Sequence, residues 1–303
     1  MYDVIIVGGG VAGLAAGIYA TRYNLKVLVV SKDMGGLLKL AYVVENYPGL
    51  GRSNGLDIMT KMEEHAREIG VEIIEDDVDG VGKEDGYFIV KTSKDSYKSN
   101  TIVLATGSER RKLGVPGEDR FRNKGVGYCA TCDAPLMKNK IVGVVGGSDS
   151  AVVEALLLAE YAKKVCIIYR GEKVRPEPIN GKRMLAMKNI EIIPFTNVLE
   201  IRGDKMMNRV VLDKPYNGNK ELKLDGIYIE VGIVPNNALA KKLGVELDKD
   251  GYIIIDKASR TNVAGVFAAG DVTNSGWKQA IIAAAQGSYA ANSVYNYLGE
   301  KKS

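Results

Sequence analysis

The feature that most constrains this chain is a glycine-rich turn between an apolar strand and a helix of small residues, close to the N-terminus. Residues 3–7 predict a buried strand, and the pattern G-x-G-x-x-G follows at Gly8, Gly10 and Gly13. The helix and a second strand over 26–30 then complete a βαβ unit. In this context the glycines predict a dinucleotide site. The first allows a tight turn, the second lets a pyrophosphate approach the backbone, and the third lets the helix pack on the sheet.

The same pattern returns in the middle of the chain. A predicted strand over 141–145 leads into G-x-S-x-x-A, in which Gly146, Ser148 and Ala151 hold the three small positions. A helix and a strand follow. We interpret this segment as a second dinucleotide site, and a βαβ unit without a ligand is the alternative. The two units predict an α/β fold with two Rossmann-like dinucleotide-binding domains.

Strand ends near the first turn indicate further ligand contacts. The second strand ends at Ser31, with Asp33 two residues later, where an acid usually binds a ribose hydroxyl. The Ser31 hydroxyl can make a weaker version of that contact. Residues 261–272 predict a strand that ends in Gly270 and Asp271, at the sheet edge where ligands bind. Asp271 is alternatively, or additionally, the cap of a helix that begins near Gln279.

Composition and charge narrow the class of function. The net charge of +4 is scattered without a dense Lys/Arg block, which argues against a nucleic-acid partner. The apolar stretch 4–20 contains several glycines, follows Asp3 instead of basic residues, and is short for a membrane span. Three cysteines are too few for a secreted disulfide framework. We therefore expect a cytoplasmic protein without a membrane segment.

Cys129 and Cys132 form a C-x-x-C pair that is followed directly by Asp133. Zinc would need more ligands than His65 and Cys166 supply, so we expect no metal site. A structural disulfide is rare in the cytoplasm, and a redox-active pair is the prediction. A thiol at a helix start favours the thiolate. Asp133 is the candidate general acid/base or, alternatively, a helix-capping acid. Cys166 lies in an apolar strand and is expected to be a buried core thiol.

Together these motifs resemble the low-molecular-weight thioredoxin reductases, flavoproteins of class II in the FAD-dependent pyridine nucleotide-disulfide oxidoreductase family. The resemblance runs over essentially the whole chain. Besides the two glycine turns it rests on GG at 35–36, VENYPG at 44–49, ATG at 105–107, CATCD at 129–133, GVFAAGDV at 265–272 and KQA at 278–280.

The resemblance implies a discontinuous layout. An FAD-binding domain is expected over 1–112 and 239–303. An NAD(P)H-binding domain over 113–238, which carries the redox C-x-x-C, is expected to be inserted into it. Segments 110–118 and 231–237 are rich in Gly, Pro and Asn and are the expected connections. The assembly expected from this resemblance is a homodimer. One domain is expected to rotate against the other, because the cysteine pair has to meet both the flavin and a bulky partner.

The implied activity is that of a thioredoxin-disulfide reductase. Electrons would pass from NAD(P)H through FAD to the Cys129–Cys132 disulfide, and on to thioredoxin or a similar redox protein. Cys132 would face the flavin, and Cys129 would attack the disulfide of the partner. Related reductases with another donor (NADH, ferredoxin or deazaflavin) or another partner (a glutaredoxin-like protein or a peroxiredoxin) are alternatives, as is an oxidase that passes thiol electrons to oxygen. A flavin-binding scaffold is disfavoured, because it would need neither the cysteine pair nor Asp133.

The resemblance also implies two sets of cofactor-binding residues. Leu37 stands where the family commonly has Gln, which removes one polar contact near the flavin. The expected FAD contacts are Gly8, Gly10, Val11, Ala12, Gly13, Ser31, Gly35, Gly36, Leu37, Asn46, Val78, Ala105, Thr106, Gly107, Gly270, Asp271, Lys278, Gln279 and Ala280. The expected NAD(P)H contacts are Gly146, Gly147, Ser148, Asp149, Ser150, Tyr169, Arg170, Arg175 and Gly232.

The segment YRGEKVR indicates which nucleotide is the donor. Arg170 and Arg175 match the family positions that hold the 2′-phosphate of NADPH, and Tyr169 could stack on the adenine. Gly171 replaces the second arginine of the family pattern, and Glu172 adds an acid nearby. We expect NADPH as the donor, with NADH or dual use left open.

Overall fold

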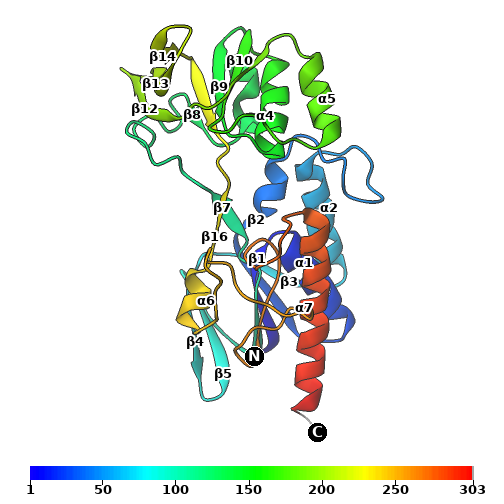
Figure 1. Cartoon of the computed structure of the whole chain (residues 1–303). Coiled ribbons are helices and arrows are strands. Elements are labelled where there is room, and N and C mark those ends of the chain that lie inside the picture. Colours follow the sequence, from blue (N-terminus) through cyan, green and yellow to red (C-terminus); the bar gives the residue numbers. More distant parts are fainter. Residues whose placement is uncertain (302–303) are drawn as a thin grey trace. The chain divides into compact units, whose positions relative to one another are not determined.

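The protein consists of two compact units in a computed structural model that describes residues 1–301. The first unit comprises Met1–Glu109 and Val234–Ser303, and the second comprises Arg110–Ile233. The chain passes between them at β7 (Ser108–Arg110) and β16 (Ile233–Pro235), two short strands that pair with each other (Figure 1). Each unit contains a sheet with parallel strands and covering helices, so the predicted α/β class is confirmed.

The first unit contains a seven-stranded sheet in the order β3-β2-β1-β6-β5-β4, with β17 also paired to β6. Strands β3, β2, β1, β6 and β17 pair in parallel, whereas β4, β5 and β6 pair antiparallel. The elements are β1 (Tyr2–Gly9), α1 (Val11–Arg22), β2 (Val27–Met34), the 3-10 helix η1 (Gly36–Leu40), α2 (Gly55–Glu68), β3 (Glu72–Glu75), β4 (Val78–Glu84), β5 (Tyr87–Thr92), β6 (Ser96–Leu104), α6 (Ala238–Lys242), β17 (Val266–Ala268) and α7 (Ala280–Glu300).

Both faces of this sheet are buried, which explains the uninterrupted apolar run of β1. Val4 and Ile6 point into a core with α1, α2 and α7, whereas Ile5 and Val7 point into a second core on the opposite face. Helices α1 and α7 pack against each other over the first face (Figure 1). Although α7 is long, no helix within residues 1–301 is apolar enough over sufficient length to cross a membrane.

The second unit contains a parallel sheet in the order β11-β10-β9-β15-β8 and a separate antiparallel sheet in the order β12-β13-β14. Its elements are β8 (Val126–Gly127), α3 (Ala130–Asp133), the 3-10 helix η2 (Ala134–Met137), β9 (Ile141–Val145), α4 (Asp149–Ala159), β10 (Lys164–Ile168), α5 (Pro178–Ala186), β11 (Ile190–Ile193), β12 (Val198–Gly203), β13 (Met207–Tyr216), β14 (Asn219–Lys223) and β15 (Gly226–Ile229).

The predicted elements are present, but some of their bounds differ. The strand predicted over 261–272 is reduced to β17 (Val266–Ala268), so Gly270 and Asp271 lie beyond its end. The second strand extends beyond its predicted end to Met34, because Met34 pairs with Gly9 after a register shift. Helix α7 begins at Ala280 with Gln279 as its N-cap residue, close to the predicted start. The alternative role of Asp271 as the cap of this helix is therefore wrong.

Replacing Gly287 of α7 by Ala should destabilise the first unit. An added Cβ would lie 2.2 Å from the carbonyl oxygen of Ala12, so α7 would have to move away from α1. Overpacking of this kind costs about 1–3 kcal/mol. Urea denaturation of the full chain measures the loss of stability.

Gly299→Ala is the matched control on the same helix, because its Cβ would meet no atom within 4 Å. The higher helix propensity of Ala should leave the control equally stable or up to about 1 kcal/mol more stable. Equal urea midpoints for the two variants would contradict the close α1–α7 contact.

Candidate functional site

The turn between β1 and α1 is packed so closely that two of its glycines exclude a side chain. A Cβ on Gly8, where φ is +117°, would lie 2.1 Å from the carbonyl oxygen of Ala105. A Cβ on Gly13 would lie 1.8 Å from the carbonyl oxygen of Gly8. Gly10 has open space around its Cβ position, and the first turn of α1 holds neither an acid nor a side-chain cap. Open space beside uncapped helix amides fits a pyrophosphate.

Two other segments of the first unit reach this turn. The Cβ position of Gly36 lies 3.6 Å from the Cα atom of Gly10, and that of Gly270 lies 2.9 Å from the Cβ atom of Ala12. The amide of Gly35 also donates a hydrogen bond to the turn. Residues that are far apart in the sequence are thus gathered at the N-terminus of α1, which is the predicted FAD site.

Asp271 and Lys278 follow the last of these segments. Both are half-buried. Burial raises the pKa of the Asp271 carboxyl, and the charge of Lys278 opposes that shift. Burial lowers the pKa of the Lys278 ammonium, which donates a hydrogen bond to the carbonyl of Thr273 and lies 4.0 Å from the centroid of the Tyr252 ring. These contacts fix the position of the Lys278 ammonium group within the first unit.

The hydroxyl of Ser31, at the expected ribose position, is already used as a donor. It donates a hydrogen bond of 2.8 Å to the carbonyl oxygen of Asp33. The Asp33 carboxylate in turn pairs with Lys39. Ser31 can consequently offer a ligand only its oxygen lone pairs, which can accept a hydrogen bond from a ribose hydroxyl as an acid would.

The remaining predicted FAD contacts lie on several elements. Asn46 donates to the side chain of Gln279 at 3.1 Å, and the Thr106 hydroxyl donates to the carbonyl of Asn236 at 2.7 Å. Val11 and Ala12 are buried in the first turn of α1, Leu37 lies in η1, Val78 begins β4, Gly107 follows β6 and Ala280 begins α7.

The second glycine turn joins β9 to α4. A Cβ on Gly146, where φ is +149°, would lie 2.2 Å from the carbonyl oxygen of Glu230. A Cβ on Gly147 would lie 2.4 Å from the ring of Tyr169, so this glycine lets the ring lie against the turn. Ser148 is the N-cap residue of α4, and its side chain makes no capping hydrogen bond. This turn is partly covered by an aromatic ring, unlike the first.

Of the two arginines expected to select the nucleotide, Arg175 contacts this turn. The amide of Arg175 donates to the carbonyl of Gly147 at 2.7 Å. Arg170 is exposed two residues beyond β10. Within residues 1–301 neither guanidinium forms an ion pair, so both remain available for an anion. Gly232, the last predicted contact, has φ of +104° just before β16.

Asp149 distinguishes α4 from α1, because it places an acid in the first helical turn. Its carboxylate accepts hydrogen bonds from the amide of Glu177 at 2.7 Å and from the side chain of Asn180 at 3.0 Å. Asp149 therefore ties the turn to the start of α5. Ser150, beside it, is exposed.

Cys129 and Cys132 form a disulfide, with their Cα atoms 5.5 Å apart. Cys129 is the N-cap residue of α3, and its sulfur accepts a hydrogen bond of 3.2 Å from the amide of Cys132. Cys129 is half-buried, whereas Cys132 is exposed. The predicted position of a thiol at a helix start is confirmed, although α3 is a single turn and its dipole is correspondingly small.

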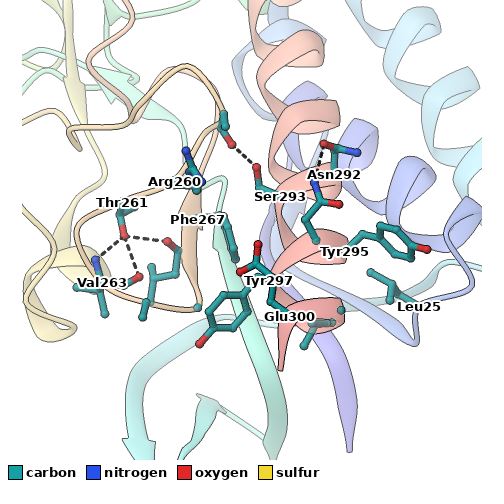
Figure 2. Close-up of a pocket in the computed structure, with 17 residues that line it drawn as sticks. Leu25, Arg260, Thr261, Val263, Phe267, Asn292, Ser293, Tyr295, Tyr297 and Glu300 are labelled. Carbon is teal, nitrogen blue, oxygen red and sulfur yellow. Dashed lines mark hydrogen bonds between the residues drawn. The ribbon is translucent and has the colours of Figure 1, made fainter. Parts of the chain in front are cut away.

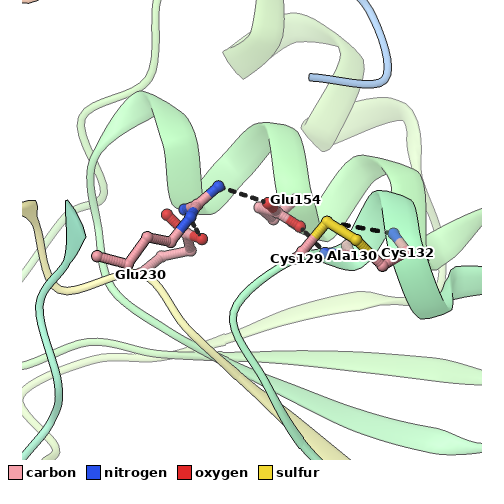
Figure 3. Close-up of polar contacts among 6 residues, drawn as sticks. Cys129, Ala130, Cys132, Glu154 and Glu230 are labelled. Atoms are coloured by element: carbon pink, nitrogen blue, oxygen red, sulfur yellow. Dashed lines mark hydrogen bonds and ion pairs between the residues drawn. A yellow bond between two sulfur atoms is a disulfide. The ribbon is translucent and has the colours of Figure 1, made fainter. Parts of the chain in front are cut away.

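A cluster of buried charged side chains is linked to this pair through Ala130, and sequence reasoning missed it. Arg110 pairs with Glu230 and, at 3.2 Å, with Glu154. Glu154 also accepts the amide of Ala130, the residue after Cys129, at 2.6 Å (Figure 3). Burial raises the pKa of Glu154, and it raises the pKa of Glu230 to about 7, while Arg110 opposes both shifts. The charged members are common residue types on separate elements, so no local pattern marked them.

Asp133 makes no side-chain capping bond to the 3-10 helix that follows it, for which it is the N-cap residue. Its Oδ2 atom lies 3.4 Å from the Cβ position of Gly127. Its charge, together with burial, raises the pKa of Tyr228, whose buried hydroxyl has no hydrogen-bond partner among the described residues. The carboxylate of Asp133 therefore lies beside Gly127, two residues before Cys129, and is not committed to the cap of that helix.

Two other groups lie outside the predicted cofactor sites. Cys166 is 1% exposed, and burial raises the pKa of its thiol, which confirms the core role predicted for it. Figure 2 shows a pocket beside the C-terminal half of α7 that contains none of the predicted cofactor residues. Its Thr261 and Ser293 hydroxyls donate to backbone carbonyls of the fold. We therefore assign no ligand to this pocket.

Comparison with known proteins agrees with these features. Residues 2–287 match the family model described as pyridine nucleotide-disulphide oxidoreductase. The thioredoxin reductase of Treponema pallidum is 39% identical over 300 residues, which are 98% of this chain and 97% of that protein. The crystal structure of Lactococcus lactis thioredoxin reductase matches with a TM-score of 0.95, and that of T. acidophilum thioredoxin reductase with 0.92. Both are 36% identical to this chain and cover at least 99% of it, and at least 99% of each matched chain is covered.

Glu230→Gln should reduce the pH dependence of stability. The pKa of Glu230 rises from 4.5 to about 7 on folding, so between these values the native state binds more protons than the unfolded state. Stability is then lost as the pH rises through this window, by up to about 3 kcal/mol. Gln cannot ionise and should remove this loss. Urea denaturation from about pH 5 to about pH 8 measures it.

The exposed Glu160→Gln, which removes a carboxylate just beyond α4, is the control. Its free energy of unfolding should equal that of the unchanged protein at every pH. If Glu230→Gln instead loses stability with pH as steeply as the unchanged protein, Glu230 is not the group responsible.

Proposed function

The chain belongs to the pyridine nucleotide-disulphide oxidoreductase family, and from this premise we propose that it is a thioredoxin-disulfide reductase. The family resemblance predicted from the motifs is thus confirmed, and the protein is an oxidoreductase. The observation that carries the proposal is the Cys129–Cys132 disulfide, which lies in the same unit as the second glycine turn. A thiol pair in such a unit can pass electrons to a protein disulfide.

We assign FAD to the first unit and the nicotinamide nucleotide to the second. The domain limits expected from the sequence, 1–112 with 239–303 and 113–238, stay a prediction beside the unit limits of Met1–Glu109 with Val234–Ser303 and Arg110–Ile233. The open space at Gly10 and the uncapped amides of α1 fit the pyrophosphate of FAD. Gly146, Gly147 and Ser148 form the equivalent turn for the nucleotide. When bound, these two cofactors supply the electron pair that opens the disulfide.

The cysteine pair then carries out a dithiol–disulfide exchange. The thiolate of Cys129 attacks one sulfur of the thioredoxin disulfide, so a mixed disulfide forms and one thioredoxin thiolate leaves. The thiolate of Cys132 attacks the Cys129 sulfur, which restores the Cys129–Cys132 disulfide and releases the second thioredoxin thiolate. Thioredoxin gains two electrons, the pair loses two, and the two protons end on the thioredoxin thiols.

Asp133 is the proposed proton carrier for this exchange. It directly follows Cys132 and lies close to Gly127 of β8. The second unit contains no histidine, because His65, the only one in the chain, lies on α2 of the first unit. Asp133 can accept a proton when a thiol of the pair ionises and return it to a departing thiolate.

We propose NADPH as the preferred donor. Arg175 is held beside Gly147 by its backbone, and Arg170 follows β10, so two guanidinium groups are available for the 2′-phosphate. Tyr169 lies against the turn, where its ring can stack on the adenine. Glu172, in the same segment as the two arginines, opposes binding of the 2′-phosphate and favours some use of NADH.

The proposed assembly is a cytoplasmic homodimer. Within each chain, the two units are proposed to reorient during turnover. Tyr19 on α1 and Tyr289 and Tyr295 on α7 are 45%, 56% and 47% exposed. Aromatic side chains are enriched at protein interfaces, which supports association through this surface of the first unit. The two short connections β7 and β16 are the only crossings between the units within residues 1–301, which supports reorientation.

Cys129→Ser should abolish thioredoxin reduction but leave the bleaching of the flavin by NADPH intact. Loss of the attacking thiol should lower thioredoxin turnover by roughly a thousandfold or more. Cys132→Ser should instead trap a stable mixed disulfide with thioredoxin, visible on a non-reducing gel. Cys166→Ala, which changes only the buried core thiol, is the control.

Cys132 is the more exposed cysteine of the pair, so the assignment of Cys129 as the attacking thiol needs its own test. The same two variants provide it. A mixed disulfide trapped by Cys129→Ser and absent from Cys132→Ser would reverse the assignment. Turnover of thioredoxin by Cys129→Ser at the unchanged rate would refute the dithiol mechanism. An absence of flavin bleaching with either nucleotide would favour a different electron donor.

Arg170→Ala and Arg175→Ala should each lower kcat/KM for NADPH by about tenfold and change that for NADH by less than about twofold. Each removes one charge-assisted contact to the 2′-phosphate, which NADH lacks. Lys163→Ala, at the opposite end of β10, is the control and should leave both efficiencies unchanged. If the unchanged protein uses NADH as efficiently as NADPH, the proposed preference is wrong.

A further inference from the structure

Arg110 connects the point where the chain enters the second unit to the redox pair. It ends β7, and its guanidinium pairs with Glu154 and Glu230, whose side chains are only 10% and 5% exposed. The second oxygen of Glu154 accepts the amide of Ala130. A continuous set of charged hydrogen bonds therefore runs from β7, through α4, to the peptide that follows Cys129 (Figure 3).

This cluster holds two buried carboxylates and one guanidinium. When both carboxylates are ionised, one negative charge is left without a partner beside α3. Since burial raises the pKa of both acids, the cluster binds a proton more readily than exposed acids would. The oxygen that Glu154 turns toward Ala130 carries part of this charge to the start of α3.

We propose that Glu154, held by Arg110, is a positioning residue that disfavours negative charge on Cys129 in the reduced pair. This inference rests on the proposed function, because it takes Cys129–Cys132 as the pair that reduces a protein disulfide. The role goes beyond a structural cap, since it depends on the charge of the carboxylate as well as on its hydrogen bond.

Two features of the geometry support this role. The Ala130 amide is committed to Glu154, so the amide that reaches the Cys129 sulfur is that of Cys132 at 3.2 Å. The carboxylate, which lies 2.6 Å from the amide of the residue after Cys129, also repels a thiolate on Cys129. A pair whose reduced, ionised form is poorly stabilised is the stronger reductant. Glu154 therefore favours the transfer of electrons out of the pair.

Other charged groups also face this region and stay constant in the test. Asp133 follows Cys132, and the buried hydroxyl of Tyr228 lies under the influence of both Asp133 and Glu154. Tyr128, next to Cys129, donates to Glu118. The guanidinium of Arg122 lies 5.6 Å from the centroid of the Tyr128 ring.

The test measures the thiol pKa of Cys129 in the purified full chain. Cys132→Ser leaves Cys129 as the accessible thiol, because Cys166 is buried. After reduction with a phosphine, the rate of alkylation by iodoacetamide is followed from about pH 5 to about pH 10. Glu154→Gln and Glu230→Gln are added to this background. Glu160→Gln is the matched control, and the visible flavin spectrum reports folding.

Glu154→Gln keeps an oxygen that can accept the Ala130 amide but removes the charge. The thiol pKa of Cys129 should fall by about one unit, a tenfold change in the ratio of thiolate to thiol. Glu230→Gln should lower it by less, and Glu160→Gln should not change it. With both cysteines present, Glu154→Gln should also keep the pair reduced in a more oxidising glutathione buffer.

An unchanged or raised thiol pKa in Glu154→Gln would overturn the proposal and leave Glu154 as a structural hydrogen-bond acceptor. If Glu154→Gln does not fold, Glu230→Gln decides in the same way, because it reduces the negative charge of the cluster without touching the Ala130 amide. Alkylation requires neither nicotinamide nor thioredoxin. A failure of the proposed function is therefore distinguishable from a failure of this inference.

Discussion

Both units depend on the same close contact, between a glycine of the turn before a helix and the end of the neighbouring parallel strand. In the first unit, the carbonyl oxygen of Ala105, the residue after β6, occupies the space that a side chain on Gly8 would need. In the second, the carbonyl oxygen of Glu230, the residue after β15, does the same at Gly146. Each contact places a helix start at the carboxyl end of the parallel strands, where an open α/β sheet binds its ligands. The rest of each site is arranged around that helix start.

The two turns are alike in backbone and different in surroundings. The first is open at Gly10, and its helix starts without an acid, so its amides are available to a phosphate group. The second is partly covered by Tyr169 and has Asp149 in the first turn of its helix. The two turns therefore differ in the space and the charge that they offer to a phosphate group.

The redox pair could be found from sequence, whereas its electrostatic environment could not. C-x-x-C followed by Asp is a local pattern, and its chemistry follows from the spacing of the two sulfurs. Arg110, Glu154 and Glu230 come together only because β7, α4 and β15 meet behind α3. None of the three belongs to a motif. Likewise, nothing in the sequence indicates that the Ser31 hydroxyl turns to the carbonyl of Asp33.

The sequence by itself determined the two βαβ units, the position of the cysteine pair and the family, because each is written in neighbouring residues whose chemistry is local. It also predicted the buried core thiol Cys166 and the start of α7 close to Gln279. Only the tertiary structure decided that Asp271 does not cap α7 and that an arginine at the junction holds two buried acids beside Cys129. The physical reason is that burial and charge pairing depend on which distant elements pack together, and a linear pattern does not record that packing.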